Sequence, residues 1–252
     1  MTIAVILLIL FIWGFFIEPD LLVVKRYKAD NLGGKKIVFV SDFHIGKHDG
    51  LRLQKIIRMI NLQKPDLVLS GGDYIKGYSD KDSMSVQKIA EELSKIKAPI
   101  ITVLGNHDIN FDKYSVKKAL EENGIIVLDN SCTQYENISV CGVGDKKVNP
   151  SQISLALENA DGIKILLSHT PDIYYTVKEK VDLILAGHVH GGQVRIPFFG
   201  ALICPSELGT KFACGDFNET QNRMIVTKGL GTSILNVRFC DIPEIVVIEE
   251  QG

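Results

Sequence analysis

The chain has 252 residues, 46% of them hydrophobic and 23% charged, with a formal net charge of −2 at pH 7. This length and composition are typical of one large packed domain or two small ones, and they exclude a long disordered chain. The near balance of 28 basic and 30 acidic residues argues against a dedicated nucleic-acid binder, which would need a strongly positive surface.

The N-terminal segment is the first predicted element. Residues 1–17 contain no charged side chain and include a long apolar run, although a membrane span usually needs about 20 residues and at least roughly 17. A cleaved signal peptide is the alternative, but no basic residue precedes the run. We therefore expect a membrane anchor over residues 1–20 and one folded domain over residues 21–252. Lys25, Arg26 and Lys28 follow the anchor, which favours the cytoplasmic side for this domain.

Beyond the anchor, short apolar runs alternate with helical patterns, which indicates an α/β domain. The predicted strands are 37–40, 67–69, 100–104, 138–141, 165–167, 183–186, 224–226 and 245–248. Predicted helices cover 51–62, 86–96 and 114–122, where apolar residues recur every three or four positions. Residues 194–222 are rich in glycine and proline, so we expect a long loop or a hairpin there.

Polar residues that can bind metals follow several of these strands. They are Asp42, His44, Asp73, Asn106, His107, His169, His188 and His190. Strand ends in layered α/β proteins are the usual place for a ligand site. Five of the six histidines belong to this set, and the remaining one, His48, is expected to be an ordinary surface or core residue.

The ligand types define the metal chemistry. Carboxylate, imidazole and amide groups suit Mn²⁺, Fe²⁺ or Zn²⁺, whereas Mg²⁺ prefers oxygen ligands alone. Even without His107, the seven remaining candidate ligands exceed the positions available on one ion, some of which must stay open for water. The sequence therefore predicts two divalent metal ions, with Mn²⁺ preferred.

Five short motifs in a fixed order resemble those of the calcineurin-like metallophosphoesterases. They are Asp42-Phe43-His44, Gly72-Asp73, Gly105-Asn106-His107-Asp108, the isolated His169, and Gly187-His188-Val189-His190. Each motif is weak alone, but five in order are specific. Gly191-Gly192-Gln193-Val194-Arg195 and Gly229-Leu230-Gly231 extend the resemblance. They look like a bacterial branch of membrane-associated phosphodiesterases, similar to UDP-2,3-diacylglucosamine pyrophosphatases.

The resemblance implies a four-layer αββα sandwich of two mixed β-sheets flanked by helices. It implies that Asp42, His44 and His190 hold one ion, that Asn106, His169 and His188 hold the other, and that Asp73 bridges both. It further implies that His107 is catalytic and that a metal-bridging hydroxide attacks phosphorus without a covalent enzyme intermediate.

Four further features remain open at this level. Asp108 either orients His107 or caps a loop. Lys76 stands where many relatives have Asp, and we expect a solvated surface lysine there, with phosphate binding as the alternative. Arg195 either grips a substrate phosphate or is a solvated arginine after a glycine turn. The five cysteines show no disulfide framework, so most are expected to be buried thiols, with Cys204 and Cys214 as a less favoured pair.

These features predict hydrolysis of a phosphodiester or pyrophosphate bond in a phosphorylated small molecule or lipid-linked substrate at the membrane. A general phosphomonoesterase or nuclease is the second hypothesis. A metal-binding scaffold without turnover is the third, and the intact His107 argues against it.

Overall fold

Two six-stranded β-sheets face each other in the computed structural model, which describes residues 2–79, 81–144 and 152–250. The first sheet has the order β1 (Val23–Ala29), β14 (Glu244–Glu250), β2 (Ile37–Val40), β3 (Leu67–Ser70), β4 (Ile100–Thr102) and β5 (Ile126–Val127). The second has the order β12 (Gly215–Phe217), β13 (Met224–Val226), β9 (Leu183–Ala186), β8 (Ile163–Ser168), β7 (Ile138–Gly142) and β6 (Ser131–Tyr135).

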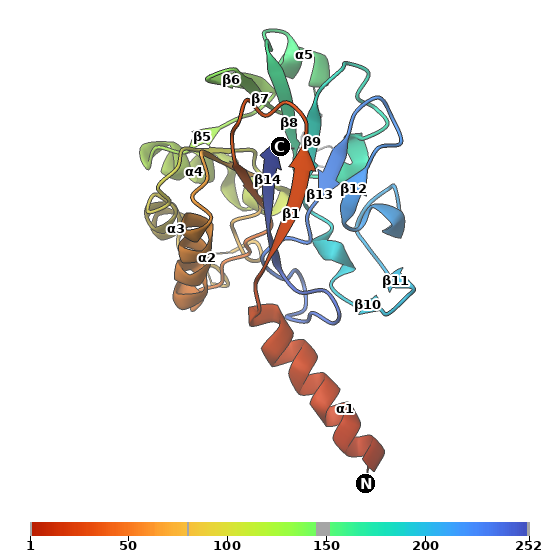
Figure 1. The fold of residues 1–252 in the computed structure, drawn as a ribbon. Coiled ribbons are helices and arrows are strands. Elements are labelled where there is room, and N and C mark those ends of the chain that lie inside the picture. The colour runs from red at the N-terminus through yellow and green to blue at the C-terminus, as the bar shows by residue number, and fades with distance from the viewer. Residues whose placement is uncertain (1, 80, 145–151, 251–252) are drawn as a thin grey trace.

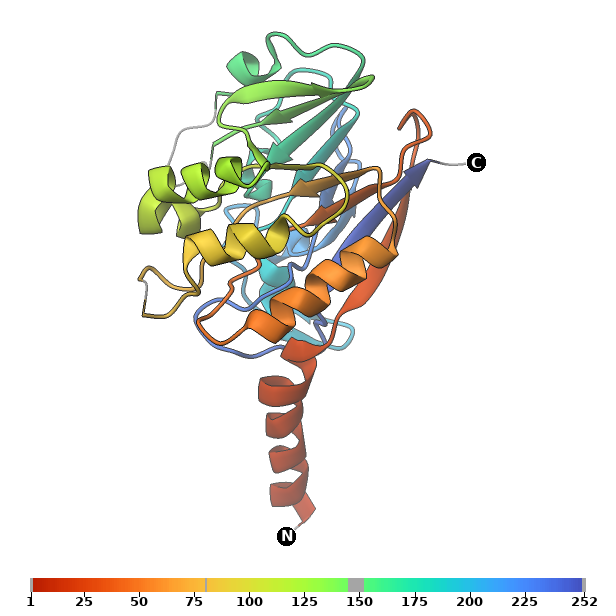
Figure 2. The same ribbon diagram turned by 90° about the vertical axis from the view of Figure 1, so that its left-hand side faces the viewer.

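Both sheets are mixed. In the first, β14 runs antiparallel to β2, while the other neighbouring strands are parallel. In the second, the edge strands β12 and β6 run antiparallel to their neighbours around a parallel centre. Helices lie on the outer faces (Figures 1 and 2). The predicted α/β sandwich of two mixed sheets flanked by helices is thereby confirmed.

The main core lies between the two sheets. Phe39 and Leu69 of the first sheet belong to the same buried cluster as Val140 and Leu167 of the second. Strands that are covered on both faces must be apolar on both faces. This is why β2, β3 and β9 were recognisable as short continuous apolar runs.

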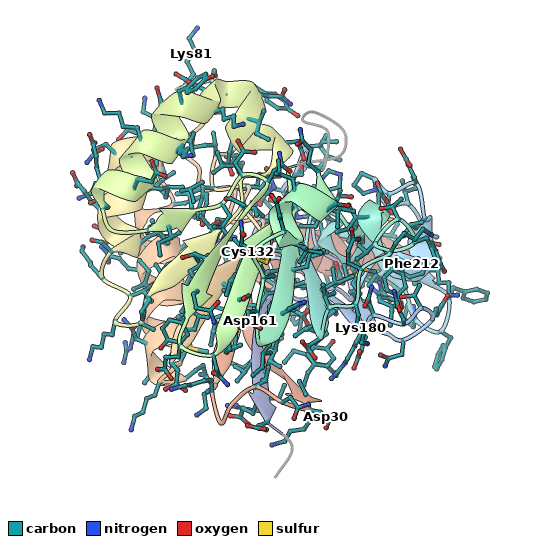
Figure 3. The ribbon with its side chains drawn as sticks, turned by 90° about the horizontal axis from the view of Figure 1, so that it is seen from above. Asp30, Lys81, Cys132, Asp161, Lys180 and Phe212 are labelled. Carbon is teal, nitrogen blue, oxygen red and sulfur yellow. A yellow bond between two sulfur atoms is a disulfide. The ribbon has the colours of Figure 1, made fainter. Side chains whose placement is uncertain are left out.

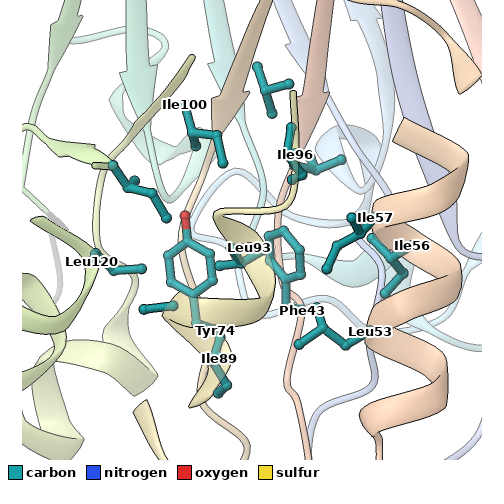
Figure 4. Close-up of a cluster of buried hydrophobic side chains, with 14 of the residues drawn as sticks. Phe43, Leu53, Ile56, Ile57, Tyr74, Ile89, Leu93, Ile96, Ile100 and Leu120 are labelled. Carbon is teal, nitrogen blue, oxygen red and sulfur yellow. The ribbon is translucent and has the colours of Figure 1, made fainter. Parts of the chain in front are cut away.

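A second cluster packs the first sheet against α2 (Gly50–Leu62), α3 (Val86–Leu93) and α4 (Asn106–Glu122). Phe43 and Tyr74 stack there with ring centroids 5.0 Å apart, among Leu53, Ile57 and Leu93 (Figure 4). Both aromatic residues follow a predicted metal ligand in the sequence, so their burial anchors the loops that carry Asp42 and Asp73. The second sheet has a thinner cover, made of α5 (Ile153–Leu157) and the 3₁₀ turns η3 (Pro171–Ile173) and η5 (Thr210–Phe212).

Some boundaries differ from the sequence-based expectation. Helix α4 begins at Asn106 rather than near residue 114, and its backbone is non-helical at Asp112. The Asp112 carboxylate accepts hydrogen bonds from the backbone of Tyr114 and Ser115, as an N-cap does. The helical pattern was therefore visible only after this internal cap. The edge strands β1 and β6 are polar enough that no apolar run marked them. Between residues 194 and 222 lie the short ribbon β10 (Arg195–Ile196) with β11 (Gly200–Ala201), η5 and β12.

The N-terminal segment forms α1 (Thr2–Ile12), continued by η1 (Trp13–Ile17) and η2 (Glu18–Asp20), and it projects away from the sandwich (Figure 1). Residues Thr2–Asp20 are long and apolar enough to cross a membrane, a property that signal sequences share. The side chains of α1 are exposed along its whole length.

The expectation of buried thiols was wrong, whereas the expectation that Cys204 and Cys214 do not pair is confirmed. Cys132 on β6 and Cys141 on β7 occupy directly opposed positions and form a disulfide, with Cys132 labelled in Figure 3. Opposed residues on antiparallel strands bring their side chains together, which spacing in the sequence does not reveal. Cys204 and Cys214 are not joined and are only partly buried, and Cys240 is exposed.

Candidate metal centre

The predicted ligands meet at one edge of the sandwich, at the carboxyl ends of the parallel strands. The first sheet supplies Asp42 and His44 after β2, Asp73 after β3 and Asn106 after β4, while the second supplies His169 after β8 and His188 and His190 after β9. Apart from Asn106, which is partly exposed, these side chains are buried. Asp42 and His190, which are 148 positions apart in the sequence, thus converge because the two sheets end at the same edge of the sandwich.

The first ligand set consists of Asp42, His44 and His190, with ligand atoms within 4.8 Å of one another. The Nε2 atoms of His44 and His190 are 3.1 Å apart. His190 Nε2 lies 3.7 Å from Asp42 Oδ1. These are the residues that the resemblance assigned to one ion.

The second set consists of Asp73, His169 and His188. His169 Nε2 lies 3.1 Å from His188 Nδ1 and 3.1 Å from Asn106 Oδ1. The same Asp73 oxygen, Oδ2, is 3.3 Å from His169 Nε2 and 3.5 Å from His44 Nε2. One carboxylate oxygen therefore faces both sets, as a bridging ligand must.

The donor groups fit divalent cations. Ligands bound at roughly 2.0–2.2 Å in tetrahedral or octahedral geometry are about 3.0–3.6 Å from one another, which is close to the separations found here. His44 and His169 place Nδ1 at 3.1 Å from the Ile75 carbonyl and 2.7 Å from the Gly71 carbonyl. When Nδ1 donates to a carbonyl, the Nε2 lone pair is left for a metal.

The electrostatics favour the metal-binding protonation states. Burial lowers the pKa of His44 to about 3, and burial together with His44 and Arg238 lowers the pKa of His190. Both rings are therefore neutral near pH 7, the form that coordinates metal. Burial opposes ionisation of Asp73, but the neighbouring His169, His44 and His107 outweigh it and lower its pKa. Burial raises the pKa of Asp42 to about 6, and a bound cation would stabilise its ionised form.

The backbone at the ligands is unusual. Five of the seven have a positive φ, between 42° and 70°, namely Asp42, His44, Asp73, His188 and His190. Non-glycine residues rarely adopt this left-handed conformation, and such residues cluster at functional sites. Hydrogen bonds hold it in place, for example from the His188 backbone N–H to both Asp42 carboxylate oxygens at 3.0 Å.

Two motif glycines allow the close approach of these loops. A Cβ at Gly187 would lie 2.6 Å from Asp42 Oδ2, and a Cβ at Gly105 would lie 2.6 Å from His169 Cε1. Real Cβ atoms do not come that close, so both positions need glycine.

His107 lies at the edge of the two ligand sets. Its Nδ1 is 3.0 Å from the Gly77 carbonyl, and its ring stacks on Tyr78 and meets His44 edge-on, each with centroids 4.6 Å apart. His107 also lies within ligand distance of His44 and Asp73, so geometry alone does not separate a catalytic role from a ligand role.

Asp108 does not orient His107. Its carboxylate accepts hydrogen bonds from the backbone N–H groups of Asp73, Tyr74, Ile75 and Gly105. Of the two expectations, the loop cap is confirmed, and it holds the Asp73 loop rather than the His107 ring.

The other candidates have different surroundings. Lys76 is half-buried and lines a cavity of about 340 Å³ together with His44, Tyr78 and His107, which is not the position of a fully solvated lysine. Arg195 donates to the Gly191 carbonyl at 2.8 Å and lies 3.9 Å from Asp241, so a contact with substrate stays a prediction. His48 is exposed, as expected.

Sequence reasoning missed Arg238, whose side chain is completely buried behind the His190 loop. Its guanidinium donates to the carbonyls of His190 and Lys228 and pairs with the Asp241 carboxylate at 3.0 Å. Arg238 therefore fixes the loop that carries the last ligand. The residues around Arg238 in the sequence do not distinguish it from a surface arginine. Only its burial in the folded chain sets it apart.

The model of the family described as calcineurin-like phosphoesterase matches residues 35–192. The chain belongs to this family. It is a metal-dependent phosphoester hydrolase, and residues 35–192 span all the predicted ligands. The match therefore includes the predicted ligands of both sheets, which meet at one edge of the sandwich.

Individual family members are similar over most of the chain. Metallophosphoesterase YkuE of Bacillus subtilis is 34% identical over 92% of this chain and 86% of its own length. Phosphodiesterase YaeI of Escherichia coli is 29% identical over 93% of this chain and 90% of its own. A dimetal phosphatase from Danio rerio shares the fold, with a TM-score of 0.51 and 11% identity over 78% of this chain and 88% of its own.

Proposed function

We propose that the protein hydrolyses a phosphodiester or pyrophosphate bond with a dinuclear manganese centre, acting on a lipid-linked substrate at a membrane. The proposal of two metal ions rests on Asp73. Its Oδ2 atom lies 3.3 Å from His169 Nε2 in one ligand set and 3.5 Å from His44 Nε2 in the other. The nitrogen and oxygen donors support Mn²⁺, Fe²⁺ or Zn²⁺, and the absence of a thiolate among them disfavours a structural zinc site.

Two bound cations would polarise the phosphoryl group and lower the pKa of the attacking water. Asp42, His44 and His190 would hold one ion, Asn106, His169 and His188 the other, and Asp73 both. His107, with Nδ1 held by Gly77, presents Nε2 toward the cavity, where it stabilises a phosphoryl oxygen or protonates the leaving oxygen. Lys76 lines the adjoining cavity and supplies a positive charge for a second phosphate or a charged leaving group.

Three features support a lipid-linked pyrophosphate or diester rather than a simple monoester. The N-terminal helix is apolar enough to span a membrane. YaeI, which is similar over nearly the whole of this chain, is a phosphodiesterase by name. The metal centre borders a small polar cavity of about 180 Å³, lined by His44, Arg52 and Lys76, and a larger cavity flanked by Ile203 and Ile234, which suits a phosphorus atom with two different substituents. A UDP-2,3-diacylglucosamine-like lipid precursor has this form.

A substrate panel tests the proposal. The full chain in detergent micelles is stripped of metal, reloaded separately with Mn²⁺, Zn²⁺ or Mg²⁺, and assayed on a lipid-linked pyrophosphate, nitrophenyl diesters, nitrophenyl monoesters and DNA. We expect the Mn²⁺ form to be most active, with kcat/KM for the pyrophosphate or diester at least about 100-fold above the monoester. A preference for the monoester or for DNA would replace the proposal with the general phosphomonoesterase or nuclease hypothesis.

Two features of the chain favour different sides of the membrane for the folded domain. The cations Lys25, Arg26 and Lys28 favour the cytoplasm, but they lie on β1, where Arg26 and Lys28 pair with Glu249. They therefore belong to the folded sheet as much as to the anchor. Because the Cys132–Cys141 disulfide is typical of an oxidising compartment, we favour the extracytoplasmic side over the cytoplasmic expectation.

A further inference from the structure

A group of exposed apolar side chains surrounds one mouth of the metal centre. We call it the apolar rim, and it consists of Phe198, Phe199, Leu202, Ile203, Ile234 and Leu235. Four of them lie on or beside the β10–β11 ribbon, and two lie on the loop between β13 and β14. Soluble proteins rarely expose apolar side chains in such a group unless something covers it.

The two most exposed members also have an unfavourable backbone. Phe198 has 106% relative exposure and φ of 69°, and Ile234 has 101% relative exposure and φ of 63°. A positive φ is rare for bulky residues and is a true outlier for a β-branched one. The turn that joins β10 to β11 accounts for the positive φ of Phe198, because the Phe199 backbone N–H donates to the Ile196 carbonyl. Glycine or asparagine is usual at such a position, so the turn does not account for an exposed apolar side chain there, whereas a partner surface does.

The elements that carry the rim, the β10–β11 ribbon and the loop that leads from β13 to β14, lie at the end of the molecule from which the N-terminal helix emerges (Figures 1 and 2). The junction is fixed by hydrogen bonds: the Arg238 backbone N–H donates to Gly14, the Asn236 side chain to Phe15, and the Asp241 backbone N–H to Glu18. Residues 236–241 follow Ile234 and Leu235 directly. The helix and the rim are therefore held together by one short stretch of backbone.

The rim also leads to the metal centre. A cavity of about 370 Å³ is lined by His107, His188 and His190 on one side and by Ile203 and Ile234 on the other. The two isoleucines are exposed while the histidines are buried, so the cavity opens through the rim.

We propose that the apolar rim docks on the same bilayer that holds the N-terminal helix. The metal centre then opens at the lipid–water interface and receives a phosphoester at headgroup depth, with the apolar part of the substrate remaining in the bilayer. This inference rests on the proposed lipid-linked substrate for its functional meaning, but the docking itself stands on the rim, the helix and their fixed junction.

Fluorescence quenching tests the docking on the full chain in phosphatidylcholine vesicles with brominated acyl chains. A Phe198→Trp variant is compared with Tyr114→Trp, whose site is also highly exposed but lies on α4, away from α1. Both retain Trp13 as a common background. We expect the added emission to be quenched at least about twofold in Phe198→Trp and to be unchanged in Tyr114→Trp. Equal emission of Phe198→Trp in brominated and ordinary lipid overturns the docking. Blue-shifted but unquenched emission from this variant also overturns it and assigns the rim to a protein partner.

Activity provides the second measurement. The double variant Phe198→Ser, Phe199→Ser changes ribbon residues that do not line the described cavity at the metal centre. We expect at least about a tenfold loss of kcat/KM on a lipid pyrophosphate in vesicles and no change on a soluble nitrophenyl ester. Equal loss on both substrates contradicts the docking role.

The two measurements separate this inference from the proposed function. Quenching at position 198 without turnover of lipid substrates by the unaltered protein keeps the docking and rejects the lipid-linked substrate. Turnover of the lipid substrate without quenching keeps the proposed function and rejects the docking.

Discussion

The metal centre and the apolar rim both contain left-handed residues, but they are stabilised in opposite ways. At the metal centre, Asp42 and Asp73 are buried and their loops are held by hydrogen bonds from His188 and to Asp108. At the rim, Phe198 and Ile234 point into solvent. Internal contacts organise the left-handed loops at the metal centre, whereas we propose that an external surface covers the exposed left-handed residues at the rim.

The bridging carboxylate gives the strongest test of internal organisation. Asp73→Ala removes the one group that faces both ligand sets, so we expect loss of both ions and of all measurable hydrolysis. Metal content is measured by mass spectrometry after gel filtration, with Asp161→Ala as control because Asp161 lies in an exposed turn before β8. Retention of two ions in Asp73→Ala contradicts the bridging assignment.

The His107→Ala variant tests the role of His107. This residue lies close enough to His44 and Asp73 to share a metal with them, but we expect it to act on the substrate. His107→Ala should keep both ions and lower kcat by roughly 10²–10⁴-fold, the usual size of a proton-transfer contribution. His48→Ala, an exposed histidine, should change nothing. Loss of an ion in His107→Ala would make His107 a ligand.

Arg238 tests the support behind the His190 loop. Arg238→Met leaves Asp241 and several carbonyls buried without their cation, so unfolding free energy should fall by about 3–5 kcal/mol. Thermal unfolding in micelles should show a midpoint lower by roughly 10 °C. The matched control is Arg223→Met, which removes a partly exposed pair with Asp216 and should cost about 1 kcal/mol or less. Equal effects in the two variants would show that burial of Arg238 is unimportant.

The oxidation state of Cys132 and Cys141 in the cell tests the proposed side of the membrane for the apolar rim and the metal centre. If the domain is extracytoplasmic, Cys132 and Cys141 should react with maleimide in whole-cell lysates only after reduction. Cys132→Ala should then lower the unfolding free energy by about 2–3 kcal/mol, whereas Cys240→Ala should lie within about 0.5 kcal/mol of the unaltered chain. Labelling of both cysteines without reduction would restore the cytoplasmic expectation.

The smallest expected effect comes from a substitution that relieves the backbone strain at Ile234 in the apolar rim. Ile234→Gly relieves a left-handed β-branched residue, a conformation that costs roughly 1–2 kcal/mol, and the added chain entropy of glycine offsets part of the gain. We expect the unfolding free energy in micelles to rise by about 0.5–1 kcal/mol. Leu235→Gly, next in the chain and without a positive φ, should instead lower it. A loss of stability in both variants would mean that the backbone at Ile234 is not strained.

Much of the fold was visible in the sequence because the central strands are buried on both faces. β2, β9 and β13 appear as uninterrupted apolar runs at the predicted positions. The edge strand β1 and the start of α4 were not visible, since half-exposed strands carry charges and α4 contains the internal cap at Asp112.

The sequence alone determined the family motifs and the ligand residue types, because metal chemistry restricts those positions to a few side chains with little freedom in local spacing. Only the tertiary structure decided that one Asp73 oxygen faces both ligand sets, that Asp108 caps a loop, and that Arg238 is buried behind His190. It alone brought Cys132 opposite Cys141 and placed the β10–β11 ribbon at the end of the molecule from which the N-terminal helix emerges. These features depend on which distant segments pack together, and local spacing in the chain carries no record of that packing.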